Sequence, residues 1–217
     1  MPDDSQTPRI ENPTMPATIP GPDGQPRCGW CAAAPEFFTY HDNEWGFPVA
    51  DARRLFEKLS LEGFQSGLSW RTILAKRENF RAAFHGFDFD RVADFDQGDV
   101  ERLLQDPGIV RHRGKIEAVI NNAQRALELV ARAGSLAAFI WRYEPDPSKL
   151  AAPQTASTSP ESIALSKDLK KLGWKFVGPT TVYAFMQAMG LVNDHLRECA
   201  TRARAEQALS VFQRPGA

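Results

Sequence analysis

Apolar residues recur at intervals of three and four along most of the chain. This spacing gathers them on one face of an α-helix, whereas no run of four to eight residues alternates apolar and polar positions as a half-buried strand would. The pattern therefore predicts an all-α fold. Helices are expected to begin beside Asp51, Ser69 and Asp99, whose side chains can accept hydrogen bonds from the first free N–H groups of a helix.

The longest periodic segment runs from Ile116 to Val130 and is expected to end at Gly134, because glycine commonly terminates helices. Further helices are predicted at 136–143, 162–172 and 180–189. Residues 144–161 are rich in Pro, Ser, Thr and Ala, which predicts a long loop.

The first 27 residues hold seven of the sixteen prolines and few large apolar side chains. This composition predicts a disordered tail over 1–27, followed by one helical domain over 28–217. Neither a signal-peptide pattern nor an apolar stretch long enough to cross a membrane occurs, so we expect a cytoplasmic monomer without membrane contacts. The net charge of −1 argues against a polycationic nucleic-acid binder, so any DNA contact must come from a local patch.

Such a patch follows a predicted hairpin between two helices. The turn contains Gly108, and the entry into the long helix carries Arg111, Arg113 and Lys115. A glycine turn that leads into a helix N-terminus presents backbone N–H groups to an anion, and the three cations add positive potential. A simple interhelical turn with solvated charges is the alternative, but the density of basic residues favours DNA binding.

Cysteine and histidine are concentrated near the two ends of the sequence. His195 and Cys199 are four residues apart on what the pattern indicates is a helix, so they are expected to share a face, and Cys28 and His41 offer two more ligands. A closed set of two cysteines and two histidines is typical of structural zinc. Cys31 leaves a second set open, in which it replaces His41.

Six segments closely resemble the bacterial DNA-3-methyladenine glycosylase I (Tag) family. They are RCGW at 27–30, YHDNEWG at 40–46, LEGFQSGLSW at 61–70, GIVRHRGKI at 108–116, KFVG at 175–178 and GLVNDH at 190–195. The resemblance spans about residues 28 to 199. It implies a helix-hairpin-helix glycosylase fold that binds double-stranded alkylated DNA and carries a structural Zn²⁺ joining the terminal segments.

The resemblance also implies individual roles. Glu62 matches the base-recognising carboxylate, which we take as the catalytic residue. Tyr40 and Trp70 match residues that stack on the base, and Trp30, in the same N-terminal motif, is expected to line the edge of the base pocket. The family's zinc ligands fall on Cys28, His41, His195 and Cys199, which favours His41 over Cys31. Without the family, Trp70 would fit a core residue and Glu62 a solvated charge at a helix end.

The implied reaction is hydrolysis of the N-glycosidic bond of 3-methyladenine in base excision repair, which releases the base and leaves an abasic site. Methylation at N3 makes the base cationic, so the bond is weak and the base departs neutral. No Asp occurs between Asp106 and Asp146, consistent with modest acid–base machinery. The alternatives are a Schiff-base role for Lys115, a DNA-binding module without activity, and a catalytic-zinc hydrolase.

Overall fold

The computed structural model describes residues 17–216 and is built almost entirely of helices, which confirms the all-α prediction. Two three-residue strands, β1 (Thr18–Pro20) and β2 (Pro26–Cys28), form an antiparallel pair before the first helix. The α-helices are α1 (Glu36–Asn43), α2 (Ala52–Gln65), α3 (Trp70–Ala75), α4 (Arg77–Ala83), α5 (Phe89–Val92), α6 (Gln97–Gln105), α7 (Arg113–Ala133), α8 (Leu136–Trp141), α9 (Pro160–Lys171), α10 (Pro179–Ala188) and α11 (Ala200–Val211). Short 3-10 turns span Gly29–Ala33, His85–Phe87 and Pro147–Lys149.

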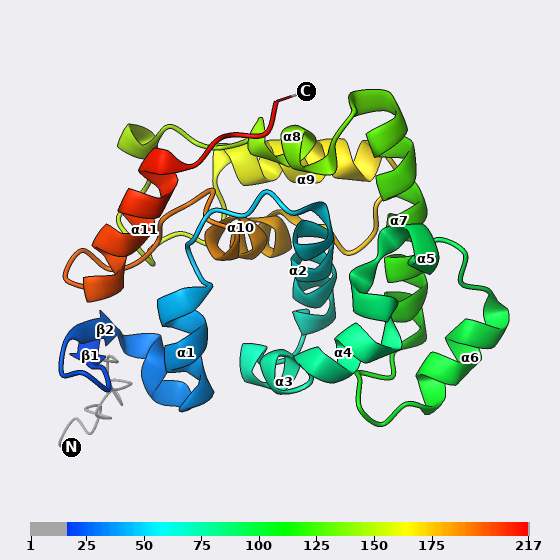
Figure 1. Cartoon of the computed structure of the whole chain (residues 1–217), viewed down its shortest axis with the longest axis horizontal. Helices are drawn as coiled ribbons and strands as arrows, with labels where there is room; N and C mark the ends of the chain where they lie inside the picture. The colour runs from blue at the N-terminus through cyan, green and yellow to red at the C-terminus, as the bar shows by residue number, and fades with distance from the viewer. Residues whose placement is uncertain (1–16, 217) are drawn as a thin grey trace, which may run out of the picture.

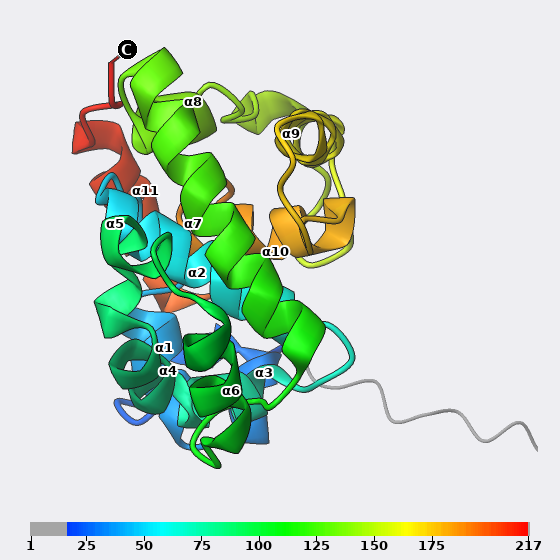
Figure 2. The ribbon, with the colours of Figure 1, turned by 90° about the vertical axis from the view of Figure 1, so that its right-hand side faces the viewer.

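Helix α2 occupies the centre of the molecule (Figure 1), where it packs against α3, α7, α8 and α10. Every residue from Leu55 to Phe64 is buried, because neighbours cover this helix on all sides. Helix α7 is the longest and crosses one side of the molecule obliquely (Figure 2). None of the helices in residues 17–216 is long and apolar enough to span a membrane.

The two ends of the described chain meet on one side of the molecule. The strand pair, α1 and α11 lie together at the left of Figure 1, and α4, α5 and α6 lie at the right. Residues that are far apart in sequence therefore become neighbours at the left, which is the condition for a cluster built from both chain ends.

The helix starts predicted from side-chain caps are confirmed in two cases. Asp51 accepts a hydrogen bond from Arg54 N–H at the start of α2, and Ser69 accepts one from Thr72 N–H at the start of α3. The third differs, because Asp96 caps α6 and Asp99 closes a reciprocal capping box with it.

Two further expectations about helices are wrong. The spacing of Ile73, Leu74, Arg77 and Phe80 predicts a single helix from Ser69, but this segment divides at Lys76 into α3 and α4. His195 and Cys199 do not lie on a helix: His195 is in the loop after α10, and Cys199 is the residue before α11. Helices α1, α5 and α11 were not predicted from the pattern.

Part of the predicted disordered tail is ordered. Residues 17–27 contain β1 and a turn at Gly24, and Arg27 is buried with ion pairs to Asp23 and Asp42. Composition missed this because the anchor, Asp42, lies fifteen residues away in α1. The remainder of the expected tail, residues 1–16, lies outside the described residues.

A glycine after the end of α10 allows the backbone there to pass close to the loop between α1 and α2. Gly190 has a φ of 77°, and a Cβ there would lie 2.4 Å from the backbone of Phe47 and Pro48. The same close approach lets Val49 N–H donate to Met189 O at 3.2 Å. Gly190 thus holds the loop between α1 and α2 against the end of α10.

We expect Gly190→Ala to lower the free energy of unfolding by roughly 3 kcal/mol or more, because it adds both a left-handed strain and a backbone clash. Gly134→Ala is the matched control: Gly134 follows α7 with the same φ of 77°, but nothing lies within 4 Å of its Cβ. Its loss should be only about 1 kcal/mol. Chemical denaturation of both variants measures the difference, and equal losses would contradict the close crossing.

Candidate functional site

Four buried side chains converge where the chain ends meet. The ligand atoms of Cys28, His41, His195 and Cys199 all lie within 4.8 Å of one another. His195 Nδ1 is 3.0 Å from His41 Nε2 and 3.8 Å from each sulfur, and Cys199 Sγ is 3.5 Å from His41 Nε2. A tetrahedral ion with ligand bonds of about 2.0–2.3 Å requires ligand separations of about 3.3–3.8 Å. The cluster is therefore compatible with a closed four-coordinate metal site.

The outer nitrogens of both histidines have acceptors. His41 Nδ1 is 2.7 Å from Asp42 Oδ1, and His195 Nε2 is 3.0 Å from the carbonyl oxygen of Trp45. A proton on each of these outer nitrogens leaves the inner nitrogen unprotonated and directed into the cluster, as metal binding requires. Asp42 is held in turn by Arg27 Nε at 2.8 Å. Asp42 and Arg27 were not singled out from the sequence, although the adjacency of Asp42 to a ligand histidine was a usable signal.

Cys31 is equally buried but lies outside the four-residue cluster. The geometry therefore favours the set with His41 over the alternative with Cys31.

Gly46 leaves room for the side chain of His195, which reaches the cluster from a loop. It has a φ of 84°, and a Cβ there would lie 2.8 Å from His195 Nε2. The absence of a side chain lets the imidazole pack against the end of the YHDNEWG segment. The expected convergence of His195 and Cys199 is correct, but their helical spacing is not its cause.

The residues predicted to bind a base gather beside this cluster. Tyr40 precedes His41 on α1, and its ring centroid is 5.3 Å from that of Trp70, the first residue of α3. Glu62, on α2, is buried. Trp30 lies 6.4 Å from the Tyr40 ring and packs edge-on against Trp45, at the border of the group. We refer to Tyr40, Glu62 and Trp70 as the aromatic box.

The three members of the aromatic box meet at a residue that the sequence analysis missed, Lys58. Its Nζ is 2.8 Å from Glu62 Oε1, donates to Tyr40 Oη at 2.8 Å, and lies 3.3 Å from the centroid of the Trp70 ring. The i, i+4 spacing of Lys58 and Glu62 was visible in the sequence but is typical of exposed helix surfaces. Only the burial of α2 turns it into an internal pair.

A cavity opens next to Glu62. It measures about 250 Å³ and is lined by Glu62, the loop 65–68 and three residues of α10. Leu68 is 42 % exposed at its wall. The indole N–H of Trp70 is buried and has no acceptor among the described residues, so a ligand or an ordered water would complete its bonding. Another cavity, of about 380 Å³ beside α11, contains none of the predicted site residues.

The hairpin between α6 and α7 has the predicted topology but not the predicted free N–H at Gly108. Gly108 N–H donates to Asp106 Oδ1 at 2.7 Å, and its carbonyl accepts from Lys76 Nζ at 3.2 Å. The N–H groups of Arg113 and Gly114 begin α7 and have no acceptor within their own helix. An anion would therefore bind at these residues and not at Gly108.

The three predicted DNA-binding cations differ in environment. Arg111 is exposed, and the structure gives it no ionic partner within residues 17–216. Arg113 is exposed and pairs with Glu101 at 2.7 Å. His112, which lies between the two arginines, is the N-cap of α7 and accepts from Lys115 N–H through Nδ1 at 3.2 Å.

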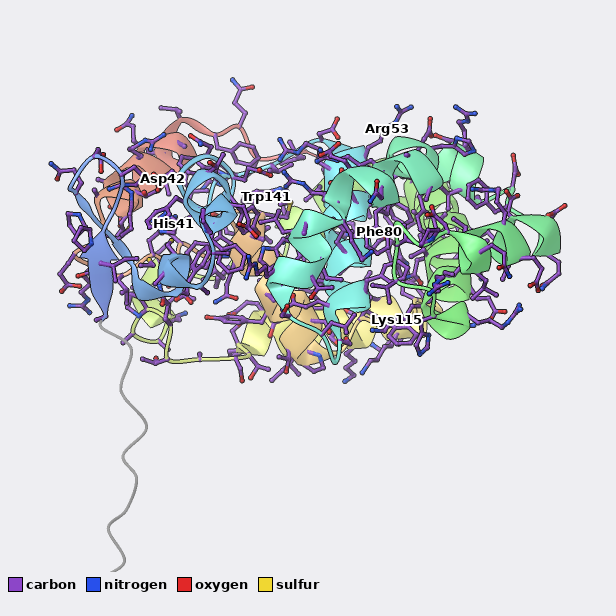
Figure 3. The ribbon with its side chains drawn as sticks, turned by 90° about the horizontal axis from the view of Figure 1, so that it is seen from below. His41, Asp42, Arg53, Phe80, Lys115 and Trp141 are labelled. Carbon is purple, nitrogen blue, oxygen red and sulfur yellow. The ribbon has the colours of Figure 1, made fainter. Side chains whose placement is uncertain are left out.

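Lys115 departs from its expected position as a phosphate contact. It is buried, and its Nζ donates to the carbonyl oxygens of Phe64 at 2.8 Å and Ser66 at 2.5 Å. These carbonyls end α2, where a helix has no internal donors to satisfy them. Figure 3 shows Lys115 well away from His41 and Asp42, which lie at the end of the molecule that carries the strand pair. Lys115 thus ties the N-terminus of α7 to the wall of the cavity beside Glu62.

The chain is similar to known proteins over most of its length. The family model described as methyladenine glycosylase matches residues 30–203. The chain is 51 % identical over 177 residues to DNA-3-methyladenine glycosylase 1 of Escherichia coli, an alignment that covers 80 % of this chain and 95 % of that protein.

Solved structures give the same result. A crystal structure of a 3-methyladenine DNA glycosylase I is 50 % identical with a TM-score of 0.76 and covers 80 % of this chain and 98 % of its own. A structure of 3-methyladenine DNA glycosylase I from Staphylococcus aureus, which describes how that protein recognises 3-methyladenine, is 40 % identical with a TM-score of 0.74. It covers 78 % of this chain and 92 % of its own.

The four-residue cluster predicts that the purified protein holds about one metal ion per chain. His41→Ala should lose the ion and lower Tm together, because a ligand and a link between the chain ends disappear at once. Cys31→Ala is the control, since Cys31 is as buried as the ligands but outside the cluster. Elemental analysis with thermal unfolding measures both variants. Loss of the ion from Cys31→Ala, with retention in His41→Ala, would reverse the ligand assignment.

Proposed function

The chain belongs to the methyladenine glycosylase family and is a DNA glycosylase of base excision repair, and on that premise we propose how its residues excise 3-methyladenine. The aromatic box of Tyr40, Glu62 and Trp70 binds the base after the damaged nucleotide has left the stack. Hydrolysis of the N-glycosidic bond is monofunctional, so it yields the free base and an abasic site. The observation that carries this proposal is the convergence of two aromatic rings and one buried carboxylate beside an open cavity.

The chemistry of the box suits a cationic purine. An enzyme that acts on a base in duplex DNA must extrude it, and stacking in the pocket offsets part of the unstacking free energy. The rings of Tyr40 and Trp70 favour a cation over a neutral base by roughly 0.5–2 kcal/mol. Glu62 supplies a charge-assisted acceptor for the exocyclic amino group. These interactions favour alkylated adenine, whose positive charge ordinary adenine lacks.

Bond cleavage needs little acid catalysis because the base leaves without charge. The electron pair of the N-glycosidic bond passes to the cationic base and neutralises it, while water adds to the sugar carbon and releases a proton. Glu62 holds the base through its exocyclic amino group in the geometry of the transition state.

The surroundings of Lys115 support hydrolysis over a Schiff-base mechanism. A nucleophilic lysine needs a free amine within reach of the sugar. Lys115 Nζ is instead directed at two carbonyls at the end of α2. Its role in this proposal is to hold the hairpin and the base cavity in a constant relative position.

DNA would contact the hairpin and the cavity wall together. Arg111 and the first N–H groups of α7 bind phosphate, and the exposed Leu68 lines the cavity next to the carbonyl of Ser66 that Lys115 contacts. Arg113 contributes less, because Glu101 already neutralises part of its charge.

Zinc is the metal that best suits the four-residue cluster. Two thiolates and two imidazoles in tetrahedral separation are its usual structural ligands, and the closed set leaves no position for a reacting water. Bound zinc would link the two chain ends. The absence of an open coordination position in the four-residue set argues against a catalytic-zinc hydrolase. A cytoplasmic location and a monomeric state remain predictions from the sequence.

Glu62→Gln should lower the rate of 3-methyladenine release from methylated DNA by at least about tenfold, because it removes the charge while preserving the shape of the side chain. Glu57→Gln is the matched control: Glu57 is a buried, ion-paired carboxylate on the same helix but contacts Arg81 outside the box. Chromatography of released bases measures both. Wild-type release by Glu62→Gln, with an unchanged circular dichroism spectrum, would remove Glu62 from the mechanism, and no release by the wild-type protein would favour a DNA-binding module.

Arg111→Met and Lys115→Met should separate DNA binding from stability. Arg111→Met is expected to weaken binding to DNA of any sequence and reduce the slope of log affinity against log salt by about one. Lys115→Met is expected to lower the free energy of unfolding by about 1–3 kcal/mol, because two carbonyls lose their donor. Binding titrations at several salt concentrations and urea denaturation measure the two effects. A loss of stability in Arg111→Met, or none in Lys115→Met, would contradict the assignment.

A further inference from the structure

Lys58 occupies the place where the proposed function puts the base. Its side chain is buried on α2, one turn before Glu62. The ammonium group contacts the carboxylate, the phenol oxygen and the indole face at the distances given above. These are the three groups that bind a cationic purine in our proposal. The free protein therefore already holds a cation in the aromatic box.

The ammonium group and a stacked base cannot be present together. Nζ lies 3.3 Å from the centroid of the Trp70 ring, which is about the distance at which the plane of a stacked purine would lie. Tyr40 Oη and Glu62 Oε1 both reach the same Nζ, so they approach this face of Trp70 and not the opposite one. A base that uses all three groups must take the space of the ammonium group.

From this overlap, and resting on the proposed function, we propose that Lys58 is a displaceable internal occupant of the aromatic box. The cationic base replaces it before bond cleavage, and Lys58 returns afterwards and expels the neutral product. Lys58 takes part in no covalent step. It is thus a residue that governs base affinity and product release.

Before cleavage, replacement of the ammonium group by the base is favourable. After cleavage, replacement of the base by the ammonium group is favourable. An entering 3-methyladenine nucleotide brings a positive charge that takes over the contacts with Glu62 and Trp70, so the carboxylate is not left unpaired in a buried site. Once the bond breaks, the electron pair neutralises the base and those contacts weaken. The ammonium group then competes with a neutral ligand and not with a cation.

The properties of the lysine side chain allow this movement. Its four-carbon stem has several rotatable bonds, and an ammonium group is strongly hydrated in water. Burial lowers the pKa of Lys58, which indicates that its environment opposes the charged form even though Glu62 supports it. Departure from the box therefore restores hydration that the ammonium group lacks inside it.

Lys58→Met tests the proposal, because methionine has similar length and no charge. The two probes are 9-methyladenine, which is neutral, and 3,9-dimethyladeninium, which carries the positive charge of the damaged nucleoside. We expect the variant to bind both probes more tightly, by a similar factor of roughly ten, because neither must displace the ammonium group. Inhibition of base release by free 3-methyladenine should strengthen to the same extent.

Lys58→Arg and Lys171→Met are the matched controls. Arginine keeps the charge, so its probe affinities should be no tighter than those of the wild type. Lys171 is exposed on α9 and pairs with Asp168, so its change to methionine should leave the affinities unaltered. Calorimetric titration of the four proteins, with circular dichroism to verify folding, measures these effects.

The remaining outcomes overturn the proposal in distinguishable ways. A much larger gain for the cationic probe than for the neutral one would mean that Lys58 stays beside the base and repels it. Unchanged or weaker binding of both probes by Lys58→Met would mean that Lys58 only supports Glu62. Failure of the wild-type protein to release 3-methyladenine from methylated DNA would instead refute the proposed function, whatever the probe affinities are.

Discussion

The closure of the two chain ends around Cys28, His41, His195 and Cys199 is the constraint on which the site depends. His41 and Tyr40 are consecutive on α1, so one backbone segment directs one side chain into the cluster and its neighbour into the aromatic box. Helix α1 has only eight residues and would be marginal alone. A link between residues 28 and 199 would therefore fix the phenol of Tyr40, which our proposal places against the base, as well as the chain ends.

A second set of contacts, made by Lys115, connects the helix that carries Glu62 to the hairpin. Helix α2 carries Glu62 in its last turn and ends at carbonyls that accept from Lys115 on α7. Lys115 lies in the first turn of α7, so its hydrogen bonds connect the start of that helix to the cavity wall. In our proposal, these buried hydrogen bonds set the distance between a phosphate bound at α7 and the extruded base.

Much of the fold could be predicted from the sequence, because it depends on local rules. Asp51 and Ser69 cap helices as expected, since capping involves only the next three residues. Two of the expectations that were wrong concern long-range partners. Arg27 orders residues 17–27 through Asp42, and Lys115 is buried by the end of α2. No spacing rule reveals such pairs, so charged residues near a hairpin or tail were interpreted as solvated or as bound to DNA.

The role of Lys58 could not be predicted from the sequence either, because it depends on burial. A lysine four residues before a glutamate normally indicates an exposed pair worth a few tenths of a kcal/mol. Here the pair is inside the protein, where one unpaired carboxylate would be strongly destabilising. A site built to bind a cation must contain uncompensated negative charge and electron-rich rings, and both are unfavourable when the site is empty. The free protein therefore needs a cation of its own, and α2 provides it from the turn next to Glu62. The pocket must bind a charged base selectively, and it must also be stable when no base is bound. One flexible side chain meets both requirements, because it occupies the pocket when the base is absent and leaves when the base enters.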